Sequence, residues 1–216
     1  MTLQATLADL LDHLGDIAPG RIRLHPAPGT ATEDDVLRAN DQYGSLYELV
    51  DGVLVEKAMG FRESLLAAAL IEVLRRFVRQ HNLGLVTAPD GMMRLAAGLV
   101  RIPDVAFISW GRLPQRRVPT APIPDLAPDL AVAVLSAGNT SREMARKCRE
   151  YFAAGVRVVW LVDPETRTVT VHTRLENATV LSESDMLQGG EVLEGFTLSV
   201  RVLFAELDQQ GDDAAR

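Results

Sequence analysis

The sequence contains very little cysteine and no grouping of histidines that is typical of a metal site. Cys148 is the single cysteine in the chain, so an intrachain disulfide and a multi-cysteine metal site are both excluded. The histidines share no spacing that is typical of a zinc site; they are His13, His25, His81 and His172. GxGxxG and GxxxxGK[ST] motifs are also missing, so nucleotide binding through a glycine-rich loop has no support.

Long apolar runs and basic N-terminal residues are missing as well. No stretch approaches the ~18 uninterrupted apolar residues of a membrane-spanning helix. No Lys or Arg precedes Arg21, so a secretory signal is not expected, and we expect a cytoplasmic protein with no membrane partner. The net charge of −7 argues against a protein that coats nucleic acid regardless of sequence, although local charge decides the matter for a nuclease.

The residues that are present predict a single α/β domain. The hydrophobic content of 47% over 216 residues is enough for one substantial core. Alternating apolar and polar positions around Asp51-Gly52 predict a β-hairpin, and apolar spacing predicts a long helix from about Glu63 to Gln80. A second hairpin is expected with its turn near Gly98.

Two continuous apolar runs predict buried strands on either side of a loop, and a charged helix follows them. The runs read DVAFI and LAVAVL, and such strands are typical of sheets covered on both faces. The helix from about Ser141 to Ala154 is expected to begin with a capping box formed by Thr140 and Glu143. The strand VRVVWLVD comes next, so we expect a mixed β-sheet flanked by helices, with added hairpins.

Asp104 and Lys147 are the first candidates for chemistry. Asp104 follows Pro103 at the start of a buried strand, where a carboxylate can be ordered by the sheet and still reach an ion, although strand-end aspartates often serve only as turn residues. Lys147 lies at the margin of the apolar face of its helix. A structural interpretation, in which its aliphatic stem covers apolar surface, and a functional one both remain open.

Several segments together resemble the Uma-type family of restriction-endonuclease-like proteins, within the PD-(D/E)XK nuclease superfamily. The resemblance covers about residues 33–205, and the most specific segments read PDLAVAVLS, TSREMARKCREYFAAGV and VWLVDPETRTVTVHT. It implies a restriction-endonuclease-like core in which an Asp and a Glu on adjacent strands hold a divalent cation. In this family the lysine stands on the helix after the second strand, which matches Lys147.

The second carboxylate of the family pattern is absent from this chain. The family pattern places Glu where PDLAVAVLS has Ala133. The resemblance implies Mg²⁺ or Mn²⁺ bound by Asp104 and by the backbone carbonyl of Val134, with weakened or absent binding here. Two other acids are candidates for a supporting role, namely Glu63 at the start of the long helix and Glu48 on the first hairpin. The sequence slightly favours another interpretation of Glu63, as a first-turn acid at the positive end of its helix.

The sequence therefore predicts a metal-dependent DNA endonuclease that is impaired or inactive because Ala133 replaces the expected Glu. The alternatives are a non-catalytic nucleic-acid-binding or regulatory protein on the same scaffold, and a structural or partner-binding protein. Exposed hairpins and edge strands would also allow a homodimer. Residues 1–32 are expected to form an irregular N-terminal extension, residues 33–205 the restriction-endonuclease-like domain, and residues 206–216 a flexible tail.

Overall fold

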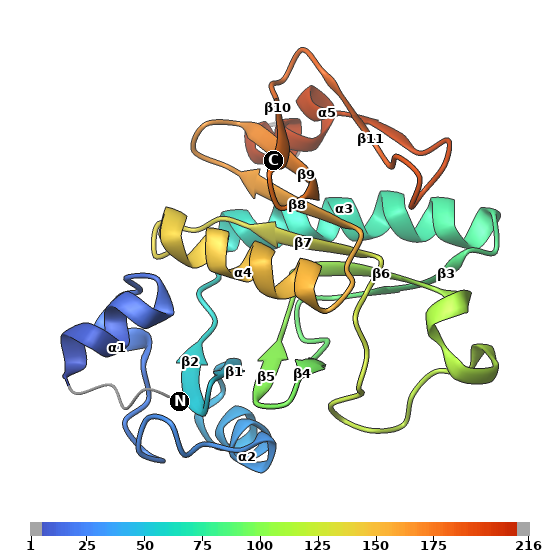
Figure 1. The fold of residues 1–216 in the computed structure, drawn as a ribbon. Helices are drawn as coiled ribbons and strands as arrows, with labels where there is room; N and C mark the ends of the chain where they lie inside the picture. The colour runs from blue at the N-terminus through green and yellow to red at the C-terminus, as the bar shows by residue number, and fades with distance from the viewer. Residues whose placement is uncertain (1–5, 211–216) are drawn as a thin grey trace, which may run out of the picture.

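A six-stranded mixed sheet with a helix on each face organises the chain (Figure 1). The computed structural model describes residues 6–210. Its helices are α1 (Leu7–Leu14), α2 (Glu33–Tyr43), α3 (Phe61–Gln80), α4 (Ser141–Ala153) and α5 (Val200–Phe204). Its strands are β1 (Tyr47–Val50), β2 (Val53–Glu56), β3 (Gly84–Thr87), β4 (Met93–Ala96), β5 (Leu99–Arg101), β6 (Val105–Ser109), β7 (Leu130–Val134), β8 (Val158–Asp163), β9 (Thr168–Arg174), β10 (Asn177–Leu181), β11 (Met186–Gln188) and β12 (Thr197–Ser199).

The large sheet has the strand order β10-β9-β8-β7-β6-β3. Only β7 and β8 pair in parallel within it, and α4 makes the crossover that a parallel pair requires. The register pairs Ala133 with Leu161 across β7 and β8, and Val105 with Val132 across β6 and β7. The start of β6 therefore lies beside the carboxyl end of β7, which brings the PD and LAVAV segments together.

The two faces of this sheet are covered by different helices. Leu66, Leu70 and Leu74 of α3 pack against Val132 of β7 and Trp160 of β8, and all five side chains are buried. On the opposite face, α4 buries its own apolar side against the alternate residues of β7 and β8 (Figure 1). Because both faces are covered, β6, β7 and β8 are nearly continuous apolar runs.

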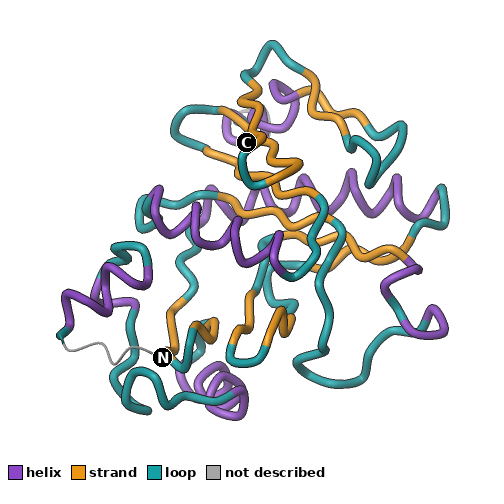
Figure 2. Tube along the Cα trace, viewed as in Figure 1, coloured by secondary structure: helices purple, strands orange, loops and turns teal. Residues whose placement is uncertain are grey.

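A second, four-stranded sheet has the order β2-β1-β5-β4 and lies apart from the large one (Figure 1). Its first hairpin turns at Asp51 and Gly52, whose positive φ values of 51° and 75° are typical of a type I′ turn. Helices α1 and α2 pack on this sheet, and β5 leads directly into β6. The loop between β6 and β7 makes a long excursion from the large sheet before it returns (Figure 2).

The structure confirms the mixed α/β class, the hairpins at Asp51-Gly52 and Gly98, and both long helices. Only one of the two hydrogen bonds of the predicted capping box of α4 is present. Thr140 accepts a hydrogen bond from the backbone N–H of Glu143, but the Glu143 carboxylate binds Arg21 instead of the N-cap backbone.

The N-terminal extension is less irregular than its composition suggests. Within it α1 is a regular helix with a complete capping box, and its apolar residues pack against β1 and β2. The predicted tail is helical from Ala205 to Asp208, and its last residues, 211–216, lie outside the described part of the chain. Among the described helices, none is long and apolar enough to cross a membrane.

Gly84→Ala should destabilise the fold, because β3 approaches β6 too closely at this point for a side chain. A Cβ atom at Gly84 would lie 2.0 Å from the backbone carbonyl oxygen of Ile108, so the two strands would have to separate. We expect a loss of ~1–3 kcal/mol in the free energy of unfolding, measured by urea denaturation. Gly20→Ala is the matched control, since a Cβ atom there meets open space. Equal effects of the two substitutions would contradict the packing at Gly84.

Candidate functional site

Asp104 is a buried carboxylate held at the junction of β6 and β7. Its backbone N–H donates to the carbonyl oxygen of Val132 at 2.8 Å, which continues the ladder between the two strands. Its Oδ2 accepts a hydrogen bond from the backbone N–H of Val134 at 2.6 Å. The residue is only 6% exposed, so the sheet itself fixes the position of this carboxylate.

The second oxygen of Asp104 faces Lys57, a residue that the sequence interpretation did not single out. Lys57 comes directly after β2, and its side chain is 5% exposed. Its Nζ lies 2.9 Å from Asp104 Oδ1 and donates to the carbonyl oxygen of Pro89 at 3.0 Å. The contact with Oδ1 is a close ion pair that lacks the alignment of a hydrogen bond, so Oδ1 has no well-directed donor among the described residues.

Lys147 points from α4 toward the same place and is paired with a different acid. Its Nζ lies 3.1 Å from Glu48 Oε2 and 3.6 Å from Glu143 Oε1. Glu48 is 0% exposed, and its carboxylate also accepts hydrogen bonds from Arg101 at 2.6 Å and from the backbone N–H of Ile102 at 3.1 Å. The margin position of Lys147 on its helix is therefore explained by a buried ion pair.

Arginines extend this network to the rest of the molecule. Arg21, from the N-terminal extension, makes two hydrogen bonds of 2.9 Å to Glu143, and it also donates to the carbonyl oxygens of Glu56 and Gly138. Arg101 donates to Glu150 of α4. The N-terminal segment, the four-stranded sheet and α4 thus meet in one set of paired charges, and the Lys57–Asp104 pair links the four-stranded sheet to the start of β6.

The ionised form of Glu48 is strongly favoured in spite of its burial. Desolvation is the largest single influence and raises the pKa of this carboxyl. The positive charges of Lys147 and Arg101, with the Ile102 N–H and the more distant Lys57, together outweigh it and hold the pKa well below its usual range. The pKa of Glu143 is also lowered, because Arg21, Lys147 and Asn139 together outweigh the opposing effect of its burial.

A small cavity lies between these groups. It has about 20 Å³ of free space, enough for one water molecule or ion, and Asp104, Lys57 and Lys147 contribute to its wall. Ala133, the position at which the sequence analysis expected a carboxylate, lines the cavity too. Four predicted site residues, Asp104, Ala133, Val134 and Lys147, therefore meet at one point.

The remaining two predicted residues differ in their placement. Glu48 does not line the cavity but binds Lys147 behind it. Glu63 stands in the first turn of α3, and its carboxylate folds back over Gly60, where a Cβ atom would lie 2.4 Å from Oε2. Glu63 is not one of the described residues that line the cavity.

The residues of this cavity do not fit a divalent cation. Mg²⁺ and Mn²⁺ require oxygen ligands, usually from one or two carboxylates. The one carboxylate in the cavity wall, Asp104, already carries the ammonium of Lys57, and Ala133 offers no ligand. Within residues 6–210, no group of three or more His, Cys, Asp or Glu side chains could hold a metal ion.

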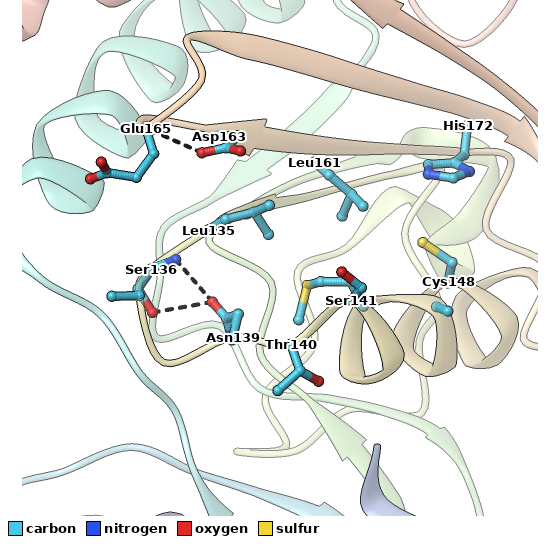
Figure 3. Close-up of a pocket in the computed structure, with 13 residues that line it drawn as sticks. Leu135, Ser136, Asn139, Thr140, Ser141, Cys148, Leu161, Asp163, Glu165 and His172 are labelled. Carbon is cyan, nitrogen blue, oxygen red and sulfur yellow. Dashed lines mark hydrogen bonds between the residues drawn. The ribbon is translucent and has the colours of Figure 1, made fainter. Parts of the chain in front are cut away.

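A larger cavity of about 460 Å³ adjoins this one between α4, β8 and β9 (Figure 3). Asn139 and Met144 line both cavities. Cys148 of α4 and His172 of β9 face the larger one; burial raises the pKa of the Cys148 thiol to about 11 and lowers the pKa of His172. Both side chains are therefore uncharged near neutral pH, and the thiol is a poor nucleophile.

The comparisons with known proteins agree with this architecture. The Uma2 family, described as "Putative restriction endonuclease", matches residues 34–201, which is more than half of the chain. The chain belongs to this family. The Uma2 match begins after α1, so the segment that carries Arg21 lies outside it.

A solved structure shows the same fold. It is the 1.96 Å crystal structure of a putative nuclease belonging to DUF820 from Anabaena variabilis ATCC 29413. The TM-score is 0.68 at 20% sequence identity, and the alignment covers 76% of this chain and 92% of the other. A search of curated proteins finds no match.

Glu48→Gln should destabilise the protein by ~3–5 kcal/mol, because it removes the fully buried carboxylate that Lys147 and Arg101 share. The lowered pKa of Glu48 means that its contribution is present above its unfolded pKa of ~4.3 and is lost as the pH falls through the folded-state value. The variant should therefore lose less stability than the wild type on acidification below about pH 4.3. Denaturant titrations at several pH values measure both effects.

The control for this prediction is Glu72→Gln, which breaks an exposed pair with Arg76 on α3. Its effect should stay within ~0.5 kcal/mol. A Glu48 variant that is as stable as this control, with an unchanged pH dependence, would contradict the charge network described above.

Proposed function

We propose that this chain is a DNA phosphodiesterase scaffold of the Uma2 family whose metal site is impaired, so that it cleaves weakly or not at all as it stands. One observation carries the proposal. Asp104, Lys147 and the methyl group of Ala133 line one small cavity at the junction of β6 and β7. The position that lacks a carboxylate is thus adjacent to the two residues that would depend on it.

The chemistry explains why one missing carboxylate would matter. Hydrolysis of a phosphodiester needs an activated water molecule and neutralisation of the charge that develops on the phosphate, and a divalent cation held by carboxylate oxygens supplies both. In this chain Asp104 would be the one carboxylate in the cavity wall to hold such a cation, with the backbone carbonyl of Val134 as its partner. Lys147 could contact a phosphate oxygen, but an ammonium group does not activate water as a metal does.

A non-catalytic role on the same scaffold is the second candidate. The observation that favours it is the pairing of Lys57 with Asp104 and of Lys147 with Glu48, which balances the buried charges without any metal. A protein of this kind would bind nucleic acid through other surfaces, and its affinity would fall with salt concentration while no strand is cut.

Ala133→Glu should produce metal-dependent cleavage, because it returns a carboxylate beside Asp104. We expect a gain on the order of tenfold or more over the wild type, since direct metal ligation contributes several kcal/mol to this type of reaction. Nicking of supercoiled plasmid DNA in millimolar MgCl₂ or MnCl₂, with EDTA as the blank, measures the gain. Ala133→Gln is the matched control, because it has the same size and no charge.

Equal activity of the glutamate and glutamine variants would contradict a role for the carboxylate. Absence of cleavage both by Ala133→Glu and by Ala133→Glu combined with Lys57→Gln, which also frees Asp104 from its ion pair, would remove the nuclease proposal in favour of the non-catalytic role, provided that circular dichroism shows folded proteins. Salt-dependent binding of a labelled DNA duplex then becomes the deciding measurement for that second candidate.

A further inference from the structure

The chain contains two lysines among its 22 basic Lys and Arg residues, and both line the same small cavity. Lys57 comes from the end of β2, and Lys147 comes from α4. The remaining residues of these 22 are all arginines. The two compact ammonium groups are thus concentrated at the one place where the family pattern expects a metal ion.

The surroundings of Lys57 resemble those that a bound cation would need. Its Nζ contacts two oxygen atoms, the carboxylate Oδ1 of Asp104 at 2.9 Å and the carbonyl oxygen of Pro89 at 3.0 Å. Carboxylate and carbonyl oxygens are the ligands that hard cations prefer. Asp104 Oδ1 has no well-directed donor among the described residues, so Lys57 is the positive charge that balances it.

We infer that the Lys57 ammonium takes the place of the divalent cation at Asp104 and closes this site to metal. This inference deepens the proposed function, on which it rests for the identity of the site. It adds a second barrier to metal binding besides Ala133. Restoring the missing carboxylate therefore removes only part of the obstacle, and Lys57 determines how tightly a metal can bind afterwards.

Counting charges at the cavity explains the expected order of affinities. Lys57 balances Asp104, and Lys147 balances Glu48, so the four groups are neutral as they stand. A divalent cation would leave an excess of two positive charges in this buried place. Ala133→Glu reduces the excess to one, and Ala133→Glu with Lys57→Gln removes it. Since unpaired charge is costly in a poorly solvated site, each step should tighten metal binding.

Isothermal titration calorimetry with MnCl₂ and with MgCl₂ tests this order. We expect no measurable binding at Asp104 in the wild type, weak binding in Ala133→Glu, and binding on the order of tenfold tighter or more when Lys57→Gln is added. Asp104→Asn in the double variant should abolish the binding. The matched control adds Arg38→Gln to Ala133→Glu, which removes one positive charge from a side chain that is 69% exposed on α2. This control should bind metal no more tightly than Ala133→Glu alone.

Lys57→Arg in the Ala133→Glu background changes the side chain at position 57 but keeps its positive charge. It therefore separates the effect of the charge from any effect of the substitution on folding. It should bind metal no more tightly than Ala133→Glu, and thermal melts should show that each variant is folded. The inference is overturned if Lys57→Gln does not tighten metal binding, if Lys57→Arg tightens it equally, or if the wild type binds a metal that Asp104→Asn removes. Metal binding that follows the expected order without any DNA cleavage would instead leave Lys57 in this role and refute the nuclease function.

Discussion

The pairing of buried charges is the constraint on which the rest of this structure depends. Placing a carboxylate in a poorly solvated interior costs several kcal/mol unless a cation and hydrogen bonds compensate it. Here Asp104 and Glu48 are both buried, and Lys57, Lys147 and Arg101 are the cations that balance them. The same contacts also join parts of the fold, because Lys57 ties the second sheet to Asp104 at the start of β6 and Lys147 ties α4 to Glu48 of the second sheet.

This constraint also connects the fold to its function. A site that holds a divalent cation needs surplus negative charge, and the cavity beside Asp104 has none. Ala133 removes one carboxylate from the expected set, and Lys57 neutralises the carboxylate that remains. Under the proposed function, both features lower the negative charge that is available to a cation at this site. The chain keeps the Uma2 fold, and the buried charges beside Asp104 are paired with each other.

Much of the fold could be predicted from local patterns. The Asp51-Gly52 turn, the apolar face of α3 and the continuous apolar runs of β6 and β7 each follow from rules that act over a few residues. The division of the strands into sheets of six, four and two strands could not be predicted in this way, since strand pairing over long sequence separations leaves no local pattern. The apolar spacing of Leu7, Leu10, Leu11 and Leu14 indicated a short amphipathic stretch, but the proline- and glycine-rich chain that follows it favoured an irregular region over the capped helix α1.

The candidate site was predictable only in part, for a related reason. Asp104 and Lys147 stand beside recognisable strands and in a recognisable helix, so the sequence indicated both. Lys57 follows the first hairpin and meets Asp104 only through the tertiary structure. The rarity of lysine in this sequence could have indicated Lys57, because the chain has only two lysines and otherwise uses arginine. The partners of Glu143 illustrate the same limit: local spacing predicted a cap, whereas Arg21, far away in the sequence, binds its carboxylate.

Nitrogen-15 NMR of the lysine ammonium groups in the wild-type protein tests whether Lys57 occupies the cation position beside Asp104. Lysine-selective labelling gives two side-chain signals to assign, and Lys57→Arg identifies the signal that belongs to Lys57. We expect the Lys57 ammonium protons to be protected from exchange with water, because the group is buried against Asp104. We also expect millimolar MgCl₂ to leave the Lys57 signal unchanged. A Lys57 signal that exchanges rapidly with water, or that shifts as magnesium is added while Asp104→Asn abolishes the shift, would contradict this placement of Lys57.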